Sequence, residues 1–332
     1  MIVSLWRQFN PKLIFSSIVS DDSSDKLWLV FLDEWSDEVF ILRSALVSCF
    51  IILAGTLSLS AQQIAQIYIS NEGQSCLEQL NFNTGQITIL YQIGAEPDDL
   101  TLNSAGQLIY SVPNLHTVNL FDPTTKVNTV LTSSISGARD LTIEPGGKSL
   151  LISKYSSPAQ IWRYSFVNKT AGVFFPKTAG ITAFDGTAYD VYGNLYAVAS
   201  HNTIIQIDPV TGAIKNTLVI EPHNGINGGD GLTYDSYTNS LWATHDGKTS
   251  PLGFGLMQIP VQASGFVSTS PGFTFYPLNQ ISNMDGIKSD GKGNLYIGAI
   301  HTAVVYNIPT NAVLKSVVVK GADGVSLVPG TY

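Results

Sequence analysis

A repeated motif constrains this chain more than any other feature. From Gln62 onward, an Asp followed by Gly or Leu opens an alternating apolar segment, then comes a turn containing Gly or Asn, then a second segment of the Leu-Tyr type. The repeats begin at Asp99, Asp140, Asp185, Asp230, Asp285 and Asp323. Successive starts are 41, 45, 45, 55 and 38 residues apart. This period and content are typical of the four-stranded blades of a β-propeller.

The sixth repeat indicates how the ring closes. The segment from Asp323 lacks the second strand that follows in the other repeats, but a suitable strand lies at the other end of the domain, at 66–70. We therefore expect an all-β, six-bladed β-propeller in which the N- and C-terminal strands pair, which also protects both edges. Asp122-Pro123 and Asp208-Pro209 mark hairpin turns, because proline fixes φ. The alternative, a β-sandwich, does not explain the fixed order of these turns.

Composition excludes several classes of protein. The chain has 332 residues, a formal net charge of −8 and 44% hydrophobic residues. Only 13% are charged, against roughly 25% in average proteins. This argues against disorder, a coiled coil and nucleic-acid binding through basic patches. No nucleophile-elbow, phosphate-loop, dinucleotide or Cys-Xaa-Xaa-Cys motif occurs, which argues against serine hydrolases, nucleotide-dependent enzymes and dehydrogenases.

The N-terminal region predicts entry into the secretory pathway. The apolar segment 45–57 follows Arg43 and precedes small residues at 58–61. It is too short for a stable membrane span but fits the core of a signal peptide. We expect 44–61 to be a signal-peptide-like segment, 1–43 to be a doubtful N-terminal extension, and 62–332 to be the propeller of a secreted protein. A cytosolic tail before a signal anchor is the alternative. Asn168 begins the one Asn-Xaa-Thr glycosylation sequon of the propeller.

The repeat aspartates open the strands that line the channel, so we expect them at one channel mouth. Six unpaired carboxylates in a ring would repel one another. One interpretation is that most accept hydrogen bonds from backbone N–H groups of their turns. The other is that Asp99, Asp230 and Asp285 hold a hard cation through oxygen ligands.

A second set of polar residues follows the Leu-Tyr strands. His201, His245 and His301 come 16, 15 and 16 residues after the repeat aspartates of their blades. The corresponding positions of earlier blades are Asn114, Lys154 and Tyr155. Neutral imidazoles can donate hydrogen bonds, act as general bases or bind metal. The alternatives are independent rim histidines that cap their own loops and a three-imidazole zinc site.

Two longer segments lie near the same mouth. The Gly- and Asn-rich loop 222–229 contains His223 and is either a lid or a simple connection. The 55-residue repeat carries extra residues within 247–284. Its aromatic residues could roof an apolar pocket or belong to the core; they are Phe254, Phe266, Phe273, Phe275 and Tyr276.

The motif Asp-Gly-Ile/Leu-Xaa-Xaa-Asp-Xaa-Xaa-Gly-Asn-Leu-Tyr resembles NHL repeats and the gluconolactonase-like (senescence-marker-protein) propellers. The resemblance covers nearly all of 62–332 and concerns the fold. It also implies a metal-dependent lactonase, with Ca or Zn near Asp285 and Asp230. The metal-binding members usually carry Asn where this chain has Asp230, and a first-blade Glu where it has Asp99.

The overall pattern is also similar to the fungal hetero-Diels–Alderases of tropolone–sesquiterpene pathways. That resemblance implies the cofactor-free cyclisation of a quinone methide, made from a tropolone or phenolic polyketide, with a humulene-type alkene. Such a reaction needs an orienting cavity and donors that polarise the heterodiene oxygen. We hypothesise that the polarising residues are His201, His245, His301, Lys154 and Tyr155. Asn114, Asp185, Asp230, Asp285 and His223 are the candidate substrate-binding residues.

Two other functions remain open. The first is a divalent-metal-dependent lactone hydrolase that uses the aspartates for its cation. The second is a non-catalytic secreted propeller whose mouth binds a partner or small ligand. The sequence leaves the substrate, the stereochemistry and the oligomeric state undetermined.

Overall fold

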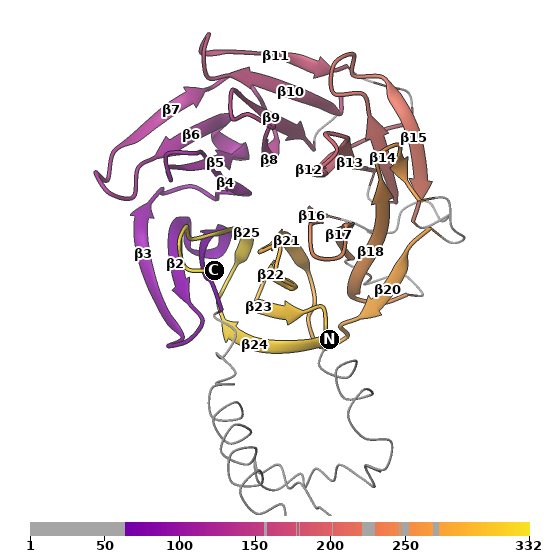
Figure 1. Ribbon diagram of the computed structural model, residues 1–332. Helices are drawn as coiled ribbons and strands as arrows, with labels where there is room; N and C mark the ends of the chain where they lie inside the picture. The colour runs from indigo at the N-terminus through magenta and orange to yellow at the C-terminus, as the bar shows by residue number, and fades with distance from the viewer. Residues whose placement is uncertain are drawn as a thin grey trace, which may run out of the picture. The chain divides into compact units, whose positions relative to one another are not determined.

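Six antiparallel β-sheets surround a central channel in the computed structural model (Figure 1). It describes residues 64–155, 158–176, 178, 180–200, 202–220, 230–245, 247, 252–267 and 272–332. The predicted extension 1–43 and signal-peptide-like segment 44–61 lie outside the described residues. No helix in the described part of the chain is both long and apolar enough to cross a membrane.

Each sheet is one blade, and its strands follow one another outward from the channel. Blade 1 contains β25 (Ala322–Leu327), β1 (Gln66–Asn71), β2 (Cys76–Asn81) and β3 (Gln86–Gln92). Blade 2 contains β4 (Leu100–Leu102), β5 (Leu108–Val112), β6 (Thr117–Phe121) and β7 (Asn128–Thr132). Blade 3 contains β8 (Ala138–Ile143), β9 (Ser149–Lys154), β10 (Gln160–Ser165) and β11 (Thr170–Phe175).

The second half of the ring repeats this arrangement. Blade 4 contains β12 (Phe184–Tyr189), β13 (Leu195–Ala199), β14 (Thr203–Ile207) and β15 (Ile214–Val219). Blade 5 contains β16 (Leu232–Asp235), β17 (Ser240–His245), β18 (Gly255–Gln262), β19 (Gly265–Phe266) and β20 (Thr274–Pro277). Blade 6 contains β21 (Met284–Ser289), β22 (Asn294–Ala299), β23 (Thr302–Asn307) and β24 (Ala312–Val318). Short 3₁₀ turns, η2 (Glu72–Gln74) and η3 (Pro113–Leu115), follow β1 and β5.

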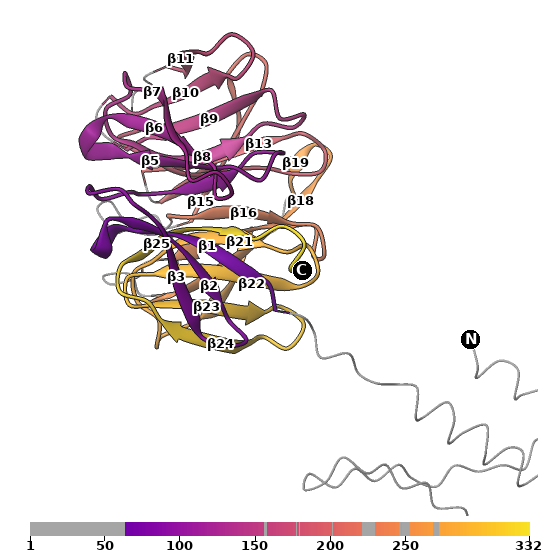
Figure 2. The same ribbon diagram turned by 90° about the vertical axis from the view of Figure 1, so that its left-hand side faces the viewer.

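The predicted ring closure is confirmed. β25 pairs antiparallel with β1, with Ile67 opposite Leu327 and Ile69 opposite Val325. The two strands therefore lie side by side although they come from opposite ends of the propeller sequence (Figures 1 and 2). The fold is a six-bladed β-propeller, as the repeats predict.

The core lies between neighbouring blades. The second strands, such as β5, β13 and β17, are buried on both faces, because each blade packs against the next. The outermost strand β24 is mostly exposed. Trp242, fully buried, illustrates the packing: its ring centroid lies 5.3 Å from that of Tyr276 and 6.3 Å from that of Tyr306 in blade 6. Apolar burial of this kind is the main favourable contribution to folding.

Blade 5 explains the 55-residue repeat. Its strand β18 pairs with β20 near its beginning and with the two-residue strand β19 at its end. Of the two interpretations of its aromatic residues, a roof over a pocket or part of the core, the structure supports the core. Phe266, Phe273 and Phe275 pack against the core between blades 4 and 5, whereas Phe254 and Tyr276 pack against the core between blades 5 and 6. Phe275 and Tyr276 are successive residues of β20, so their rings point to opposite faces of the sheet and reach the two different cores.

Candidate functional site

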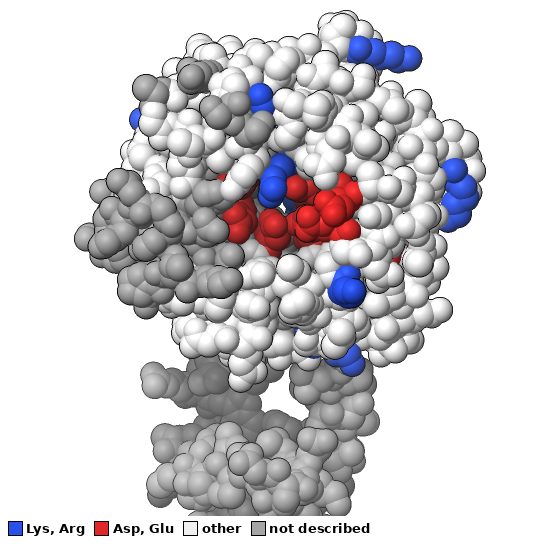
Figure 3. Space-filling view, turned by 180° about the vertical axis from the view of Figure 1, so that it is seen from behind, with Lys and Arg blue, Asp and Glu red and all other residues white. Residues whose placement is uncertain are grey.

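The innermost strands of the six blades bring their first residues to one end of the channel. Seven aspartates line the cavity there, together with two basic residues. We call this set the acid mouth: Asp98, Asp99, Asp140, Asp185, Asp230, Asp285, Asp323, Arg139 and Lys288. Viewed from behind, it is a concentration of acidic side chains around a basic one at the centre of the disc (Figure 3).

The glycines that follow several of these aspartates let the blades converge. A Cβ added to Gly186 would lie 2.5 Å from the carbonyl oxygen of Asp230, and one on Gly231 would lie 2.1 Å from that of Asp285. The strand register also shifts between Phe184 and Thr187, as expected for a β-bulge. The Asp-Gly pairs of the repeat therefore serve close approach of neighbouring blades, which places successive carboxyl groups around one opening.

Two of the carboxyl groups are oriented by the following blade. Asp99 Oδ2 accepts a 2.8 Å hydrogen bond from the backbone N–H of Leu141. Asp140 Oδ2 accepts from the Thr187 backbone N–H at 2.8 Å and from its hydroxyl at 2.6 Å. The donors to Asp140 therefore belong to the inner strand of the next blade and not to its own turn, whereas Asp99 accepts both from the next blade and from the N–H of Leu100 beside it. Each bond from the next blade fixes one carboxyl oxygen and ties two blades together.

Hydroxyl groups on the second strands form hydrogen bonds with the backbone of the residues that line the acid mouth. Thr244 Oγ1 accepts a 2.8 Å hydrogen bond from the Gly231 N–H and donates to the Asp285 carbonyl at 3.1 Å. Ser111 Oγ donates to the Arg139 carbonyl at 2.8 Å. The sequence analysis missed these residues. Their signal is a Ser or Thr on the second strand, 12 residues after Asp99 and 14 after Asp230.

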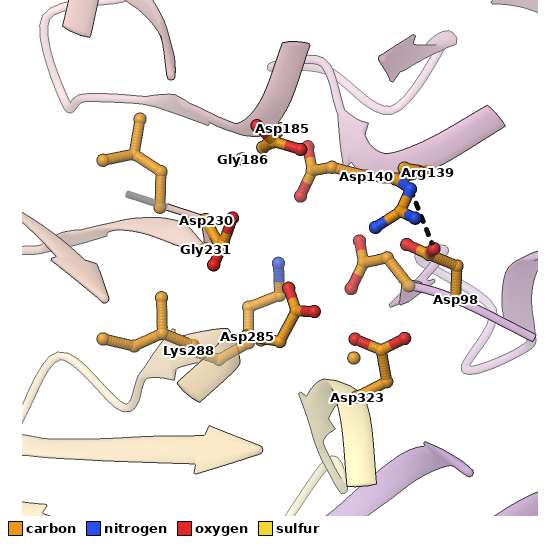
Figure 4. Close-up of a pocket in the computed structure, with 15 residues that line it drawn as sticks. Asp98, Arg139, Asp140, Asp185, Gly186, Asp230, Gly231, Asp285, Lys288 and Asp323 are labelled. Carbon is orange, nitrogen blue, oxygen red and sulfur yellow. Dashed lines mark ion pairs between the residues drawn. The ribbon is translucent and has the colours of Figure 1, made fainter. Parts of the chain in front are cut away.

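Two cations partly offset the negative charge of the mouth. Arg139 Nε lies 3.4 Å from Asp98 Oδ2, and its guanidinium carbon lies 4.2 Å from the ring centroid of Tyr155. Lys288 reaches from β21 into the space between the carboxyl groups (Figure 4). Both cations were missed as well. Each is the single basic residue at its position in the six repeats, immediately before or three residues after the repeat Asp.

Burial raises the pKa of several of these carboxyl groups. Burial, followed by the charge of Asp99, raises the pKa of Asp140 to about 8, although Lys288 and the bonds from Thr187 oppose the shift. Burial and the charge of Asp230 raise the pKa of Asp285 to about 6. Burial also raises the pKa of Asp98 and Asp323 well above the ordinary range. With its pKa of about 8, Asp140 keeps its proton near neutral pH and can act as a hydrogen-bond donor.

Of the predicted histidines, the two that the structure describes do not line this opening. His245 is fully buried, with Nδ1 2.7 Å from the carbonyl oxygen of Gly253 and its ring edge-on to Phe275. His301 is exposed in the turn between β22 and β23. Neither lines the cavity of the acid mouth. His201 and His223 lie outside the described residues, so their roles stay predictions.

The other candidates divide into those at the mouth and those away from it. Tyr155 lies beside Arg139, and burial raises its pKa. Lys154 is buried at the end of β9, opposite Ala138. Asn114 is exposed and donates a 3.2 Å hydrogen bond to Glu96 Oε2. Of the predicted substrate-binding residues, the cavity is lined by Asp185, Asp230 and Asp285.

Two further predicted sites are the metal site and the glycosylation site at Asn168. Among the residues that the structure describes, no three His, Cys, Asp or Glu side chains are placed to hold a metal ion. This includes the candidate set Asp99, Asp230 and Asp285, and one oxygen of Asp99 already accepts the Leu141 N–H. Asn168 lies exposed in the turn between β10 and β11, where its glycosylation stays a prediction.

The fold and the mouth define a six-bladed β-propeller with a carboxyl-lined channel entrance. No protein-family model matches this chain, and no curated protein sequence matches it. Several solved structures are similar to this chain. A chain of the nidogen/laminin complex is 13% identical and has a TM-score of 0.65, over 80% of this chain and 98% of that one.

Two enzymes are also similar in structure. Hydrazine synthase from Kuenenia stuttgartiensis is 17% identical, with a TM-score of 0.55 over 74% of each chain. Virginiamycin B lyase from Staphylococcus aureus is 15% identical, with a TM-score of 0.54 over 76% of this chain and 80% of that one. At these identities the likeness concerns the fold alone, which is compatible with an enzyme or with a binding propeller.

Proposed function

We propose that this propeller is an enzyme that activates an oxygen atom of a small-molecule substrate at the acid mouth, without a resident cofactor. The observation that supports the proposal is the gathering of seven aspartates, Arg139 and Lys288 around one opening, where burial raises the pKa of Asp140 to about 8. Strongly shifted pKa values in a concave site are a mark of functional sites.

The chemistry follows from the protonation states. A neutral carboxylic acid donates a hydrogen bond, and the guanidinium of Arg139 donates from a fixed plane. Such donors stabilise negative charge that develops on a carbonyl-type oxygen. The cavity at the acid mouth has a volume of about 20 Å³, room for roughly one water molecule. A substrate would therefore direct one oxygen into the mouth and keep its body outside.

The particular reaction that we propose is the hetero-Diels–Alder cyclisation. An oxygen-terminated heterodiene and an alkene form one C–C and one C–O bond, and no proton, electron pair or leaving group is lost. Hydrogen bonds to the heterodiene oxygen lower the barrier, and holding the two partners together contributes further. Within the described residues, Arg139, Asp140 and Tyr155 replace His245 and His301 as the candidate donors.

The test uses the full-length protein with a quinone methide, generated in place from a phenolic precursor, and humulene. The proposal predicts a dihydropyran product formed faster than in buffer and as a single stereoisomer. Chiral chromatography with mass detection measures both. A racemic product at the uncatalysed rate would refute the cyclisation.

The metal-dependent lactone hydrolase is the rival that the acidic mouth itself favours, because carboxylates are ligands for hard cations. A chelator should leave the cyclisation rate unchanged if our proposal holds. Lactone hydrolysis that disappears with chelator and returns with Ca²⁺ or Zn²⁺ would favour the rival. Tight substrate binding without turnover would favour the binding propeller.

A further inference from the structure

The channel has a second cavity at the end opposite the acid mouth, the end that faces the viewer in Figure 1. Its volume is about 460 Å³, within the range of roughly 300–1,000 Å³ found for small-molecule sites. It is lined by residues that follow the repeat aspartates along the inner strands, and by the C-terminal residues Pro329 and Tyr332. We call it the hydroxyl cavity.

The lining of the hydroxyl cavity combines polar and apolar residues and is almost uncharged. Hydroxyl residues from several blades line it, including Thr101, Thr233 and Ser326. The hydroxyls of these three donate to no other described residue, so they remain able to bond a ligand. Lys288 is the one charged residue among the described lining residues, and none of them is acidic. The two ends of the channel therefore differ sharply in charge.

Two aromatic walls of this cavity are held in place by hydrogen bonds behind them. The Tyr189 hydroxyl donates to Glu144 Oε1 at 2.8 Å, and the same oxygen accepts from Arg163 at 2.7 Å. The Tyr234 hydroxyl donates to Asn239 Oδ1 at 2.8 Å. Both rings line the cavity. Fixed aromatic faces beside uncommitted hydroxyls are the features of a preformed ligand site.

The charged residues in and near the hydroxyl cavity indicate which class of ligand it can bind. Among the side chains of the cavity wall, a cation would meet the ammonium group of Lys288 and no carboxylate. An anion would approach the ionised aspartates of the acid mouth, because Leu232 and Lys288 line both cavities. We propose that the hydroxyl cavity is a second binding site for a neutral ring compound that carries hydroxyl or carbonyl oxygens. This proposal concerns a different site from the proposed active site.

The test compares three probes of similar size and different charge by saturation-transfer NMR with the full-length protein. They are methyl 4-hydroxybenzoate, which is neutral, 4-hydroxybenzoate, an anion, and tyramine, a cation. We expect the neutral ester to bind about tenfold more tightly than either ion, a difference of about 1.4 kcal/mol. No binding of the ester at millimolar concentration, or equal binding of all three probes, would overturn the proposal.

Substitutions in the lining of the hydroxyl cavity test whether the ester binds there. T233V removes one uncommitted hydroxyl without changing the shape and should weaken binding roughly fivefold. The larger side chain of T101F should occupy part of the cavity and weaken binding about tenfold or more. T129V is the matched control, because Thr129 is exposed on β7 away from the channel. Arg139→Gln should still bind the ester, which separates this proposal from the fate of the proposed active site. Unchanged binding by folded T101F would overturn it.

Discussion

Asp140 combines a structural and a chemical role in one side chain. One of its oxygens holds the inner strand of blade 4 through Thr187, while burial beside Asp99 raises its pKa to about 8. The raised pKa of Asp140 and its hydrogen bonds to the next blade thus have the same origin. Both result from the close approach of the inner strands at one end of the channel. This crowding makes the acid mouth sensitive to pH.

The free energy of unfolding should fall as the pH rises through the neutral range. Asp140 binds its proton more tightly in the folded state, with a pKa of about 8, than in the unfolded state, where it is about 3.9. Between these values the folded protein holds more protons, so rising pH removes stability. Asp285, with a pKa of about 6, adds to the effect at the lower end. Thermal unfolding between pH 5.5 and 8.5 should show Tm falling by several degrees.

Asp140→Asn should flatten this pH dependence, because the amide keeps an acceptor for Thr187 and carries no titrating proton. Asp208→Asn is the control. Asp208 lies in an exposed hairpin turn, where bonds from Thr211 and Lys215 hold its pKa well below the ordinary range, so its loss acts only in acid. If Tm changed with pH equally in the wild type and in Asp140→Asn, the raised pKa of Asp140 in the folded protein would be contradicted.

At the scale of the element, the inner strands depend on glycine for close approach rather than for flexibility. Gly231→Ala would place a methyl group 2.1 Å from the Asp285 carbonyl oxygen, and overpacking of this kind costs about 1–3 kcal/mol. The expected result is a Tm lower by several degrees. Gly172→Ala on β11 is the matched control, since a Cβ there meets nothing within 4 Å. Equal Tm values for the two variants would refute this account of the repeat glycine.

Strand geometry also explains why His245 and His301 do not line the acid mouth. His245 comes 15 residues after its repeat aspartate and His301 comes 16 after its own. Side chains alternate between faces of a strand, so a difference of one residue reverses their direction. His245 ends β17 and turns into the core, whereas His301 lies two residues beyond β22. Counting along the repeat predicts the blade and the end of the channel, but not the direction of a side chain.

At the scale of the whole molecule, the repeats were sufficient to predict six blades and their closure. They also predicted that the aspartates meet, because these recur in every repeat. Arg139 and Lys288 could not be found in this way, since each occurs once in the ring and only the closed structure brings it among the carboxyl groups. The hydroxyl cavity could not be predicted from the repeats either, because its lining comes from all six blades and forms only in the closed ring.

Ring closure makes the terminal strand pair essential to the stability of the propeller. Val325 on β25 is fully buried opposite Ile69 of β1. Val325→Ala should lower the free energy of unfolding by about 2 kcal/mol, because it leaves a cavity in this junction. Val318→Ala on β24, where the side chain is 82% exposed, should change it by less than about 0.5 kcal/mol. Denaturant unfolding measures both, and similar values would contradict the closure.

The most direct test of the acid mouth as an active site is the kcat/KM of Arg139→Gln in the cyclisation assay, beside wild type and Thr129→Val. Arg139 pairs with Asp98 across 3.4 Å, and loss of a single positioned donor lowers rates by about a hundredfold or more. We predict such a loss in Arg139→Gln and none in Thr129→Val, with both variants folded. A rate for Arg139→Gln equal to that of wild type, or no product from the wild-type protein, would contradict the account.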